Sequence, residues 1–247
     1  MTQSTALVVG ASGGIGSAVA IAIAREGVAL ALIGRNLEVL TENAKVCVES
    51  GGQAFPVVCD ISQTAAIEGV VGEAIGKLGG LNYLINCAGA SIRGKLHEID
   101  LDHCDTIIDT NLRAHYYFAR HSLPEINRHP GGAVIKIGSV NAPYSGSSAY
   151  PASNQGLRGY AEVLFEDVRE FGTKVCTIRP GYVNTELVRS DNLDSALMIQ
   201  PEDIAQTVLF VLSMPGTACP TEISILPQRS PYLKVDDKSE YSLFFAS

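Results

Sequence analysis

Short apolar segments alternate with longer amphipathic segments along this chain of 247 residues. The apolar segments are rich in β-branched residues and are expected to form strands at 5–11, 29–35, 53–60, 81–89, 131–139, 173–181 and 221–227. The amphipathic segments are expected to form helices at 14–27, 37–50, 62–78, 101–128, 150–171 and 201–214, with Ser62 as a helix cap. Continuous apolar strands separated by helices indicate βαβ units. The pattern therefore predicts one α/β domain over residues 1–247, a doubly wound, seven-stranded parallel sheet flanked by helices, with strand order 3-2-1-4-5-6-7.

The composition supports a packed core and argues against several classes of protein. Hydrophobic residues make up 46% of the chain and charged residues 18%, which is typical of a folded domain. The net charge of −8 argues against binding to nucleic acid or to an anionic membrane, and no apolar run approaches the roughly 20 residues of a membrane span. The six cysteines include no C-x-x-C pair, which argues against a metal site or a disulfide framework. Because the start lacks a signal-peptide pattern, we expect a cytoplasmic protein.

A glycine-rich turn joins the first expected strand to the first expected helix. Gly10, Gly14 and Gly16 lie in the segment G-A-S-G-G-I-G. Glycine lets the backbone approach a ligand closely, and the free N–H groups of the helix start attract an anion. A glycine-rich turn alone is also common as simple turn punctuation. Its position between a strand and a helix favours a binding site for a dinucleotide pyrophosphate.

The end of the second strand bears on the type of dinucleotide. An acidic residue at this place holds the 2′-hydroxyl of the adenosine ribose in NAD-binding folds, whereas an arginine accommodates a 2′-phosphate. This chain has Gly34, Arg35 and Asn36 there and no Asp or Glu. An arginine at a strand end can also be a plain surface residue. Together with the glycine turn, Arg35 predicts NADP(H) as the cofactor.

Further short motifs follow in a fixed order along the chain. An aspartate ends V-V-C-D, an N-C-A-G segment follows the fourth strand, and an asparagine lies in D-T-N-L. A serine ends I-K-I-G-S, a tyrosine opens Y-P-A-S-N, and P-G-x-V-x-T follows the sixth strand. With the G-x-x-x-G-x-G glycines, these motifs resemble the short-chain dehydrogenase/reductase family over residues 5–227. The resemblance implies a single Rossmann domain and an NAD(P)-dependent oxidoreductase.

The resemblance also implies two overlapping sets of site residues and no metal. The expected catalytic residues are Asn111, Ser139, Tyr150 and Asn154. The expected cofactor-binding residues are Gly10, Ser12, Gly14, Ile15, Gly16, Arg35, Asn36, Asp60, Ile61, Asn86, Ala88, Gly89, Tyr150, Asn154, Pro180, Gly181, Val183 and Thr185.

The most consequential departure from the family pattern is Asn154, which stands where the family has the lysine of Y-x-x-x-K. In the family, that lysine lowers the pKa of the tyrosine and binds the nicotinamide ribose. A positive charge about 4 Å away contributes roughly 4 kcal/mol at an effective dielectric of about 20, which is close to three pKa units as an upper estimate. Asn154 can still donate a hydrogen bond to a ribose hydroxyl, but it supplies no charge.

The loss of this charge affects the two directions of reaction differently. Oxidation of an alcohol needs a tyrosinate, which becomes scarce without a nearby cation. Reduction of a carbonyl needs a protonated tyrosine, so Tyr150 keeps the form that reduction requires, although its weaker acidity costs rate. The sequence therefore predicts a site that favours reduction with NADPH.

Other cations offer weaker replacements for the missing lysine. Arg158 lies eight residues after Tyr150 on the same helix face and is expected to be a solvent or subunit-interface residue. Lys136 lies three residues before Ser139 and is expected on the strand surface. The five histidines show no metal-ligand spacing and are expected on helix surfaces: His97, His103, His115, His121 and His129.

Two segments outside the motifs are expected to shape substrate binding and assembly. The segment 183–200 mixes apolar and charged side chains and is expected to close over a small carbonyl or alcohol substrate. The segment 228–247 is a polar, turn-rich tail. The resemblance implies a homodimer or homotetramer that pairs through the helices at 101–128 and 150–171. No residue of the loop identifies a substrate.

Three functions of different classes remain open from the sequence. The first is an NADPH-dependent reductase of ketones or aldehydes with Tyr150 as the proton donor. The second is a catalytically impaired NADP-binding protein with a sensing or scaffolding role. The third is a repurposed site for non-redox chemistry with Tyr150 as acid or base. Retention of Asn111, Ser139 and Tyr150 favours the first, because a protein that only binds has no physical need for them.

Overall fold

A computed structural model describes residues 3–140, 145–188 and 190–233, and these form a single α/β domain. Seven parallel strands lie in the order β3-β2-β1-β4-β5-β6-β7, which confirms the predicted sheet. The strands are β1 (Thr5–Val9), β2 (Ala29–Gly34), β3 (Gln53–Val58), β4 (Tyr83–Asn86), β5 (Ala133–Ile137), β6 (Lys174–Pro180) and β7 (Glu222–Ile225).

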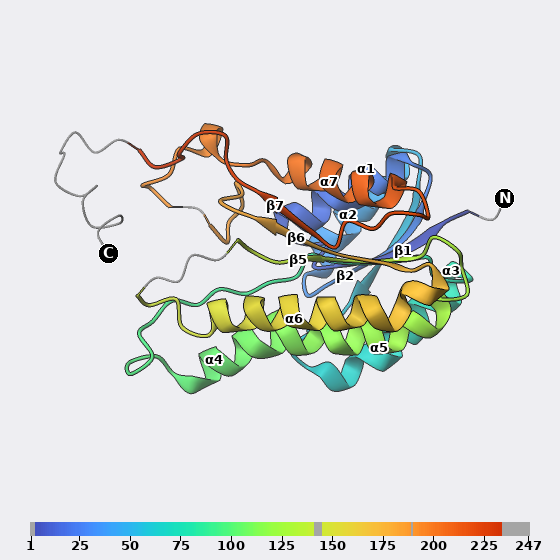
Figure 1. Cartoon of the computed structure of the whole chain (residues 1–247). Helices are drawn as coiled ribbons and strands as arrows, with labels where there is room; N and C mark the ends of the chain where they lie inside the picture. The colour runs from blue at the N-terminus through green and yellow to red at the C-terminus, as the bar shows by residue number, and fades with distance from the viewer. Residues whose placement is uncertain (1–2, 141–144, 189, 234–247) are drawn as a thin grey trace.

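Helices cover both faces of the sheet. One face carries α1 (Gly14–Arg25), α2 (Leu37–Glu49) and α7 (Pro201–Ser213), and the other carries α3 (Ile67–Leu78), α4 (Leu101–Ile108), α5 (Ala114–Ile126) and α6 (Tyr150–Val168) (Figure 1). Each layer has its own apolar core, because alternate residues of the same strand point to opposite faces. In β5, for example, Ile135 points to the α1 side and Val134 to the α5 side.

The strand order reverses direction at β1, and this reversal places the site. From β1 the chain winds outward to β2 and β3, and from β4 it winds outward the other way. Right-handed crossovers then send the helices of the two halves to opposite faces. A crevice therefore opens at the carboxyl ends of β1 and β4, where such folds bind ligands.

One helix start differs from the sequence prediction. Ser62 does not cap α3: its backbone N–H and hydroxyl donate to the Asp60 carboxylate at 3.1 and 2.9 Å. A short 3-10 turn (Thr64–Ala66) follows, and α3 begins only at Ile67. The carboxylate of Asp60 accepts two bonds in a tight turn, so the chain bends before it can form a regular helix.

The long helix expected at 101–128 is interrupted by one wide turn. A π-helical segment, Asp109–Arg113, joins α4 to α5 and contains Asn111. Such wide turns occur mostly as single insertions and often at functional sites. In the described ranges, no helix is both long and apolar enough to cross a membrane.

Candidate active site

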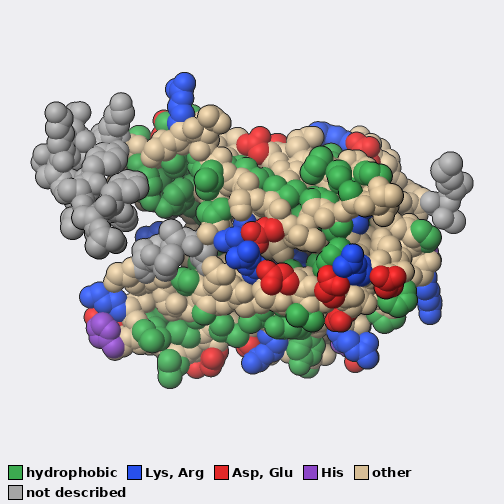
Figure 2. Space-filling model, in the orientation of Figure 1, with side chains coloured by type: hydrophobic (Ala, Val, Ile, Leu, Met, Phe, Trp, Pro, Cys, Tyr) green, Lys and Arg blue, Asp and Glu red, His purple; other side chains and the backbone are tan. Residues whose placement is uncertain are grey.

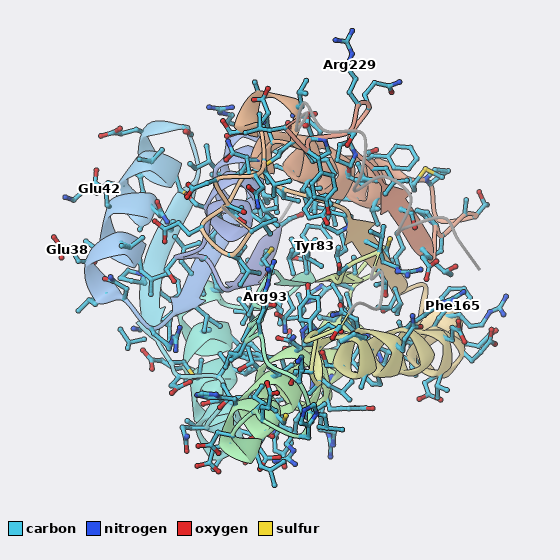
Figure 3. All side chains as sticks on the ribbon, turned by 90° about the vertical axis from the view of Figure 1, so that its left-hand side faces the viewer. Glu38, Glu42, Tyr83, Arg93, Phe165 and Arg229 are labelled. Carbon is cyan, nitrogen blue, oxygen red and sulfur yellow. The ribbon has the colours of Figure 1, made fainter. Side chains whose placement is uncertain are left out.

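A cleft of about 580 Å³ opens at the carboxyl ends of the central strands. Figure 3 views this end of the molecule; Arg93, on the loop after β4, lies near the centre of the view, and Glu38 and Glu42 mark α2 at one side. Three segments that are far apart in the sequence line the cleft: the glycine turn after β1, the loop after β4, and the first turns of α6. The cleft is therefore where the sequence motifs meet.

Two glycines of the turn, Gly10 and Gly16, are packed so tightly against backbone that they cannot be replaced without strain. Gly10 has a φ of +79°, and a Cβ there would lie 2.7 Å from the Ala88 backbone nitrogen. A Cβ on Gly16 would lie 2.2 Å from the carbonyl oxygen of Gly10. Ser12, Gly14, Ile15 and Gly16 line the cleft, whereas Gly10 holds the turn against the β4 loop. The turn forms a bare backbone cradle before the start of α1, as a pyrophosphate group requires.

The close packing of Gly10 leads to a stability prediction. Gly10→Ala should lower the free energy of unfolding by at least about 1–3 kcal/mol, because a non-glycine residue is strained at this φ and its Cβ meets the Ala88 backbone. Urea unfolding measures the change. Gly13→Ala is the matched control, since a Cβ on Gly13 lies 3.5 Å from its nearest neighbour and its φ is −89°. Equal stability of the two variants would contradict the steric account.

The residues expected at the adenosine end lie beyond the cleft lining. Arg35 and Asn36 are exposed after β2, and the Asn36 side chain accepts a hydrogen bond from the Val39 N–H at 3.1 Å, which caps α2. Asp60 is exposed after β3, and Ile61 beside it is buried. Val39 itself lines the cleft. Arg35 thus lies directly after β2 and two residues before the start of α2.

Tyr150 and Asn154 lie one helical turn apart at the start of α6, and both line the cleft. The Nδ2 of Asn154 donates to the Tyr150 carbonyl oxygen of the same helix at 3.0 Å. A Cβ on Gly138 would lie 3.5 Å from the Oδ1 of Asn154, so the amide packs over the end of β5. The asparagine is tied to its own helix and brings no charge to the tyrosine.

The side chain of Asn111 is saturated by protein partners. Its Oδ1 accepts from the Ala90 N–H at 2.7 Å, and its Nδ2 donates to the Ala90 carbonyl at 2.8 Å and to the Ser153 hydroxyl at 3.3 Å. Ser153 in turn donates to the Tyr150 carbonyl at 2.8 Å. Asn111 therefore fixes the loop after β4 and the first turn of α6 relative to each other.

Hydrogen bonds of Asn86 and Cys87 also fix the start of the loop after β4. The Oδ1 of buried Asn86 accepts from the Ala88 N–H at 3.1 Å. Ala88 and Gly89 line the cleft. The N–H of Cys87, which lies between Asn86 and Ala88, donates to the Val9 carbonyl at 2.8 Å. These bonds place the N-C-A-G segment directly beside the glycine turn.

Ser139 follows β5 and is positioned by an arginine that the sequence motifs did not indicate. The guanidinium of Arg179, on β6, donates to the Ser139 carbonyl at 3.0 Å and to the Val140 carbonyl at 3.1 Å. It also pairs with Glu222 of β7 at 2.9 Å, and Glu222 pairs with Arg158 of α6 at 3.0 Å. Acidic and basic side chains lie side by side across this edge of the molecule (Figure 2). Arg158 is half exposed and also pairs with Glu162 of the same helix at 3.5 Å.

The motif after β6 forms the remaining wall. Pro180 ends β6, the Gly181 N–H donates to the Ile225 carbonyl at 2.8 Å, and Val183 is buried. Thr185 lines the cleft, and its methyl group would lie 3.1 Å from a Cβ on Gly14. The expected substrate loop 183–200 begins here, and Asn184, Glu186 and Leu187 also line the cleft. Residue 189 of that loop and residues 234–247 of the expected tail lie outside the described residues.

Two of the surface assignments made from the sequence are wrong. Lys136 is 1% exposed, with its Nζ 3.8 Å from the ring centroid of Tyr160 on α6. His115 is 2% exposed and lines the cleft from α5. β5 is covered on both faces, so any side chain in it is buried, including a charged one. The burial of Lys136 could have been predicted from its position inside the otherwise apolar run A-V-I-K-I.

The electrostatics of these two residues follow from their burial. Burial lowers the pKa of Lys136 to about 7. Burial, and then the neighbouring Lys136, lower the pKa of His115 to about 3, with the Ala88 backbone acting in the opposite direction. Neither the Lys136 Nζ nor either ring nitrogen of His115 makes a hydrogen bond of ordinary geometry in the described part of the chain. A buried polar group without a partner costs about 1–3 kcal/mol, so these residues oppose folding.

The loop before α6 contains a strained residue. Ser148 has a φ of +54°, which non-glycine residues rarely adopt, and its Oγ lies 3.3 Å from the Cys104 Sγ of α4. Strain of this kind occurs mainly where the surroundings fix a functional geometry. Residues 141–144, which precede Ser148 in this loop, lie outside the described residues. Among the residues that are described, no group of three His, Cys, Asp or Glu side chains is arranged to hold a metal ion.

Comparison with known proteins connects this site to a large group of enzymes. A family model described as short chain dehydrogenase matches residues 4–196. An uncharacterized oxidoreductase of Staphylococcus aureus strain MRSA252 is 29% identical over 229 residues, which are 92% of this chain and 98% of the relative. An uncharacterized oxidoreductase of Staphylococcus epidermidis is 26% identical over 91% of this chain and 97% of its own length.

Solved structures resemble the whole fold. A dehydrogenase/reductase from Sinorhizobium meliloti 1021 has a TM-score of 0.84 and 29% identity, with coverage of 92% of this chain and 95% of that one. A metagenomic short-chain oxidoreductase in complex with NADP has a TM-score of 0.81 and 28% identity, with coverage of 92% and 98%. A short chain dehydrogenase from Burkholderia cenocepacia J2315 in complex with NADP has a TM-score of 0.85 and 26% identity, with coverage of 92% and 98%.

Proposed function

The chain belongs to the short-chain dehydrogenase family of oxidoreductases, and from this premise we propose that it reduces a ketone or aldehyde to an alcohol with NADPH. The observation that carries the proposal is the meeting of three elements in one cleft. The glycine cradle, Tyr150 and Asn154 all line it, and the Ser139 segment is fixed at its edge by Arg179. A protein that only bound a nucleotide would not require the tyrosine and the serine at this place.

The residues present fit a dinucleotide. A Cβ on Gly10, or on Gly16, would meet backbone atoms at 2.7 or 2.2 Å, so the turn is shaped as bare backbone in front of α1. Gly14, Ala88 and Gly89 continue this surface toward Tyr150. When bound, NADPH supplies the hydride that reduces the carbonyl carbon. Two of the similar solved structures are complexes with NADP, which supports this cofactor over others.

The remaining chemistry falls to the side chains of this chain. Tyr150 gives its hydroxyl proton to the substrate oxygen, and Ser139 holds that oxygen by a hydrogen bond. Asn154 orders the tyrosine's helical turn without adding a charge. Leu187 and Asn184, at the start of the loop after β6, border the space next to Tyr150. Reduction uses the tyrosine as a proton donor, and Asn154 adds no charge that would favour the tyrosinate needed for oxidation, so we infer that reduction is the favoured direction.

The direct test is consumption of NADPH by the purified full chain. Loss of nicotinamide absorbance should follow addition of a ketone or aldehyde from a panel of graded size, and the matching alcohol should appear in equal amount. NADP⁺ with the same alcohols at the same pH should react more slowly. If NADPH binds and no carbonyl in a broad panel is reduced, the proposal is wrong and a binding role is favoured.

The cofactor preference yields a separate prediction at Arg35. Arg35→Ala should weaken NADPH binding by about 10- to 100-fold and leave NADH binding unchanged, because an arginine–phosphate contact is charge-assisted. Fluorescence titration with each cofactor measures the two affinities. Arg25→Ala is the control, since Arg25 is also exposed but lies in the last turn of α1, at the end opposite the glycine turn. Equal NADPH and NADH affinities in the unmodified protein would refute this assignment.

A further inference from the structure

Four buried polar side chains share one layer beneath the cleft. Register pairs Asn86 of β4 with Lys136 of β5, and Lys136 with Thr177 of β6, so the three side chains point to the same face of the sheet. Alternation along β5 places them on the face of Val134, which is covered by α3, α5 and α6. His115 belongs to α5 and is buried against the same face.

All four carry polar atoms that lack partners. The Nδ2 of Asn86, the Nζ of Lys136, the Oγ1 of Thr177 and both ring nitrogens of His115 have no hydrogen-bond partner in the described ranges. Folded proteins satisfy nearly all such groups, and those left over commonly mark bound water or a functional role. Ammonium, imidazole, hydroxyl and amide groups together are donors and acceptors that can pass a proton.

His115 joins this buried layer to the cleft. It lines the cleft, four residues after Asn111 along the same helical segment. The Asn111 amide is already engaged in three hydrogen bonds to Ala90 and Ser153. The two nitrogens of His115 make no hydrogen bond of ordinary geometry in the described ranges, although the Ala88 backbone lies close enough to act on the ring. A neutral imidazole can accept a proton at one nitrogen and release one from the other.

The groups that face Lys136 leave its charge uncompensated. The Tyr160 ring of α6 lies against the Nζ, and Tyr116 of α5 packs on Tyr160 with ring centroids 4.2 Å apart. His115 is the other titratable neighbour, and no carboxylate of the described residues pairs with Lys136. With a pKa of about 7 for Lys136 and about 3 for His115, the lysine changes charge near neutral pH while the histidine stays neutral.

We propose that Lys136 and His115 form a buried proton store that serves the cleft. The inference rests on the proposed function, because the store refills Tyr150 after it has given its proton to the substrate. The Tyr150 oxyanion takes a proton from water in the cleft, and that water takes one from His115. Lys136 and His115 share no direct hydrogen bond, so a second water bridges them: His115 takes a proton from this water at its other nitrogen, and the water takes one from the Lys136 ammonium, which becomes an amine. The amine regains a proton from solvent water through the same cleft, so one proton is consumed for each carbonyl reduced.

The store replaces part of what the chain lost at Asn154. A lysine on α6 would hold its charge beside Tyr150, whereas Lys136 holds it one layer deeper and acts through His115. Lys136 and His115 are thus positioning and relay residues, and Tyr150 remains the group that touches the substrate. Asn86 and Thr177 flank Lys136 in register and provide the polar surroundings in which the ammonium can persist.

The first test uses the protein without cofactor. In ¹⁵N NMR, the His115 nitrogens should shift with a midpoint near pH 7, although His115 itself does not ionise there. The ¹³Cζ signal of Tyr150 should shift with the same midpoint. His115→Gln and Tyr150→Phe identify the two signals. Both transitions should vanish in Lys136→Met, which keeps the apolar length of the side chain and removes its amine.

The second test is the pH dependence of carbonyl reduction. In the unmodified protein, kcat should fall by up to tenfold per pH unit as the pH rises above about 7, because the store empties. Lys136→Met should lose this limb and reduce more slowly at pH 6, while NADPH affinity is retained. Lys174→Met is the matched control: Lys174 is also buried, but its Nζ donates to the carbonyls of Leu212 and Met214 at 3.3 and 2.5 Å, far from the cleft lining.

The pH dependence of the unfolding equilibrium checks that the effects of Lys136→Met come from the loss of a buried amine and not from misfolding. The pKa of Lys136 is lowered on folding from 10.5 to about 7, so the unfolded chain holds the proton between these values and the folded chain does not. The unfolding equilibrium constant should therefore fall with rising pH by up to tenfold per unit in this window. Lys136→Met should be more stable than the unmodified protein at pH 6 and should lose this slope, whereas Lys174→Met should be less stable.

The outcomes separate the store from the proposed function. NMR transitions near pH 7 that vanish in Lys136→Met support the store even where no carbonyl is reduced, and that failure then counts against the proposed function alone. Unchanged His115 and Tyr150 signals across pH 6–9 overturn the store. A reduction profile that is identical in Lys136→Met and the unmodified protein also overturns it.

Discussion

Tyr150→Phe is expected to lower the rate of carbonyl reduction by about 10²–10⁴-fold, the range that a positioned proton donor contributes. The structure places the phenol in the cleft at the first residue of α6, where the ring of phenylalanine fills the same space. The change removes only the hydroxyl, so cofactor affinity should be retained. Steady-state rates with a verified substrate, and fluorescence titration with NADPH, measure the two effects.

The control for this variant is Tyr117→Phe, which removes a hydroxyl from an exposed tyrosine of α5. It should leave the rate unchanged. Wild-type rates in Tyr150→Phe would show that another group donates the proton. Loss of NADPH binding in Tyr150→Phe would show instead that the hydroxyl serves the cofactor.

Asn154→Lys is expected to raise alcohol oxidation near neutral pH by about 10- to 10³-fold. An ammonium about 4 Å from the phenol favours the tyrosinate by up to roughly three pKa units, and oxidation requires the tyrosinate. Asn154 packs over Gly138, which has no side chain to block a longer residue. The alkaline limb of the oxidation profile should move to lower pH by a corresponding amount. Initial rates with NADP⁺ and the alcohol across pH 6–10 measure both changes.

Asn154→Gln is the matched control, because it lengthens the side chain without adding charge. It should leave the oxidation profile where it is. If the glutamine variant gains as much as the lysine variant, length and not charge is the cause. If the unmodified protein reduces no carbonyl and Asn154→Lys gains activity, the site is a lapsed catalyst that still binds its cofactor.

The fold was predictable because the central strands β1, β2 and β5 are short, nearly continuous apolar runs. Such runs are buried on both faces, which indicates a parallel sheet between two helix layers. Successive strands are added on one side of β1 up to β3 and on its other side from β4 onward, and this change of direction gives the strand order. The start of α3 was not predictable from capping preference, because Asp60 competes for Ser62 and bends the chain. The π-helical segment Asp109–Arg113 was not predictable either, because its residue types also occur in ordinary α-helices.

The cleft was predictable where a motif carries its own geometry. Gly10, Gly14 and Gly16 follow β1 directly, so their position between a strand and a helix predicted the cradle. The resemblance to the family placed Tyr150 in the same site. Arg179 was missed because it acts through backbone carbonyls, which no side-chain motif records. Whether each predicted residue binds a cofactor stays a prediction.

The burial of Lys136 and His115 was missed because residue type was weighted above position. Lysine is rarely fully buried and histidine is intermediate, yet β5 lies in the middle of the sheet and α5 lies against it. In a central strand every position is interior. A polar residue within such a strand is therefore informative in itself, and it marks a place where the chain tolerates an unfavourable contact.

The link from Arg179 through Glu222 to the last strand bears on how activity would be lost on heating. β7 is a four-residue edge strand, paired on one side only and half exposed. Elements of this kind open locally before the whole domain melts. Because Arg179 holds the carbonyls of Ser139 and Val140 and is itself held by Glu222, fraying of that edge would release the serine segment. Thermal inactivation would then begin at the sheet edge, below the melting temperature of the core.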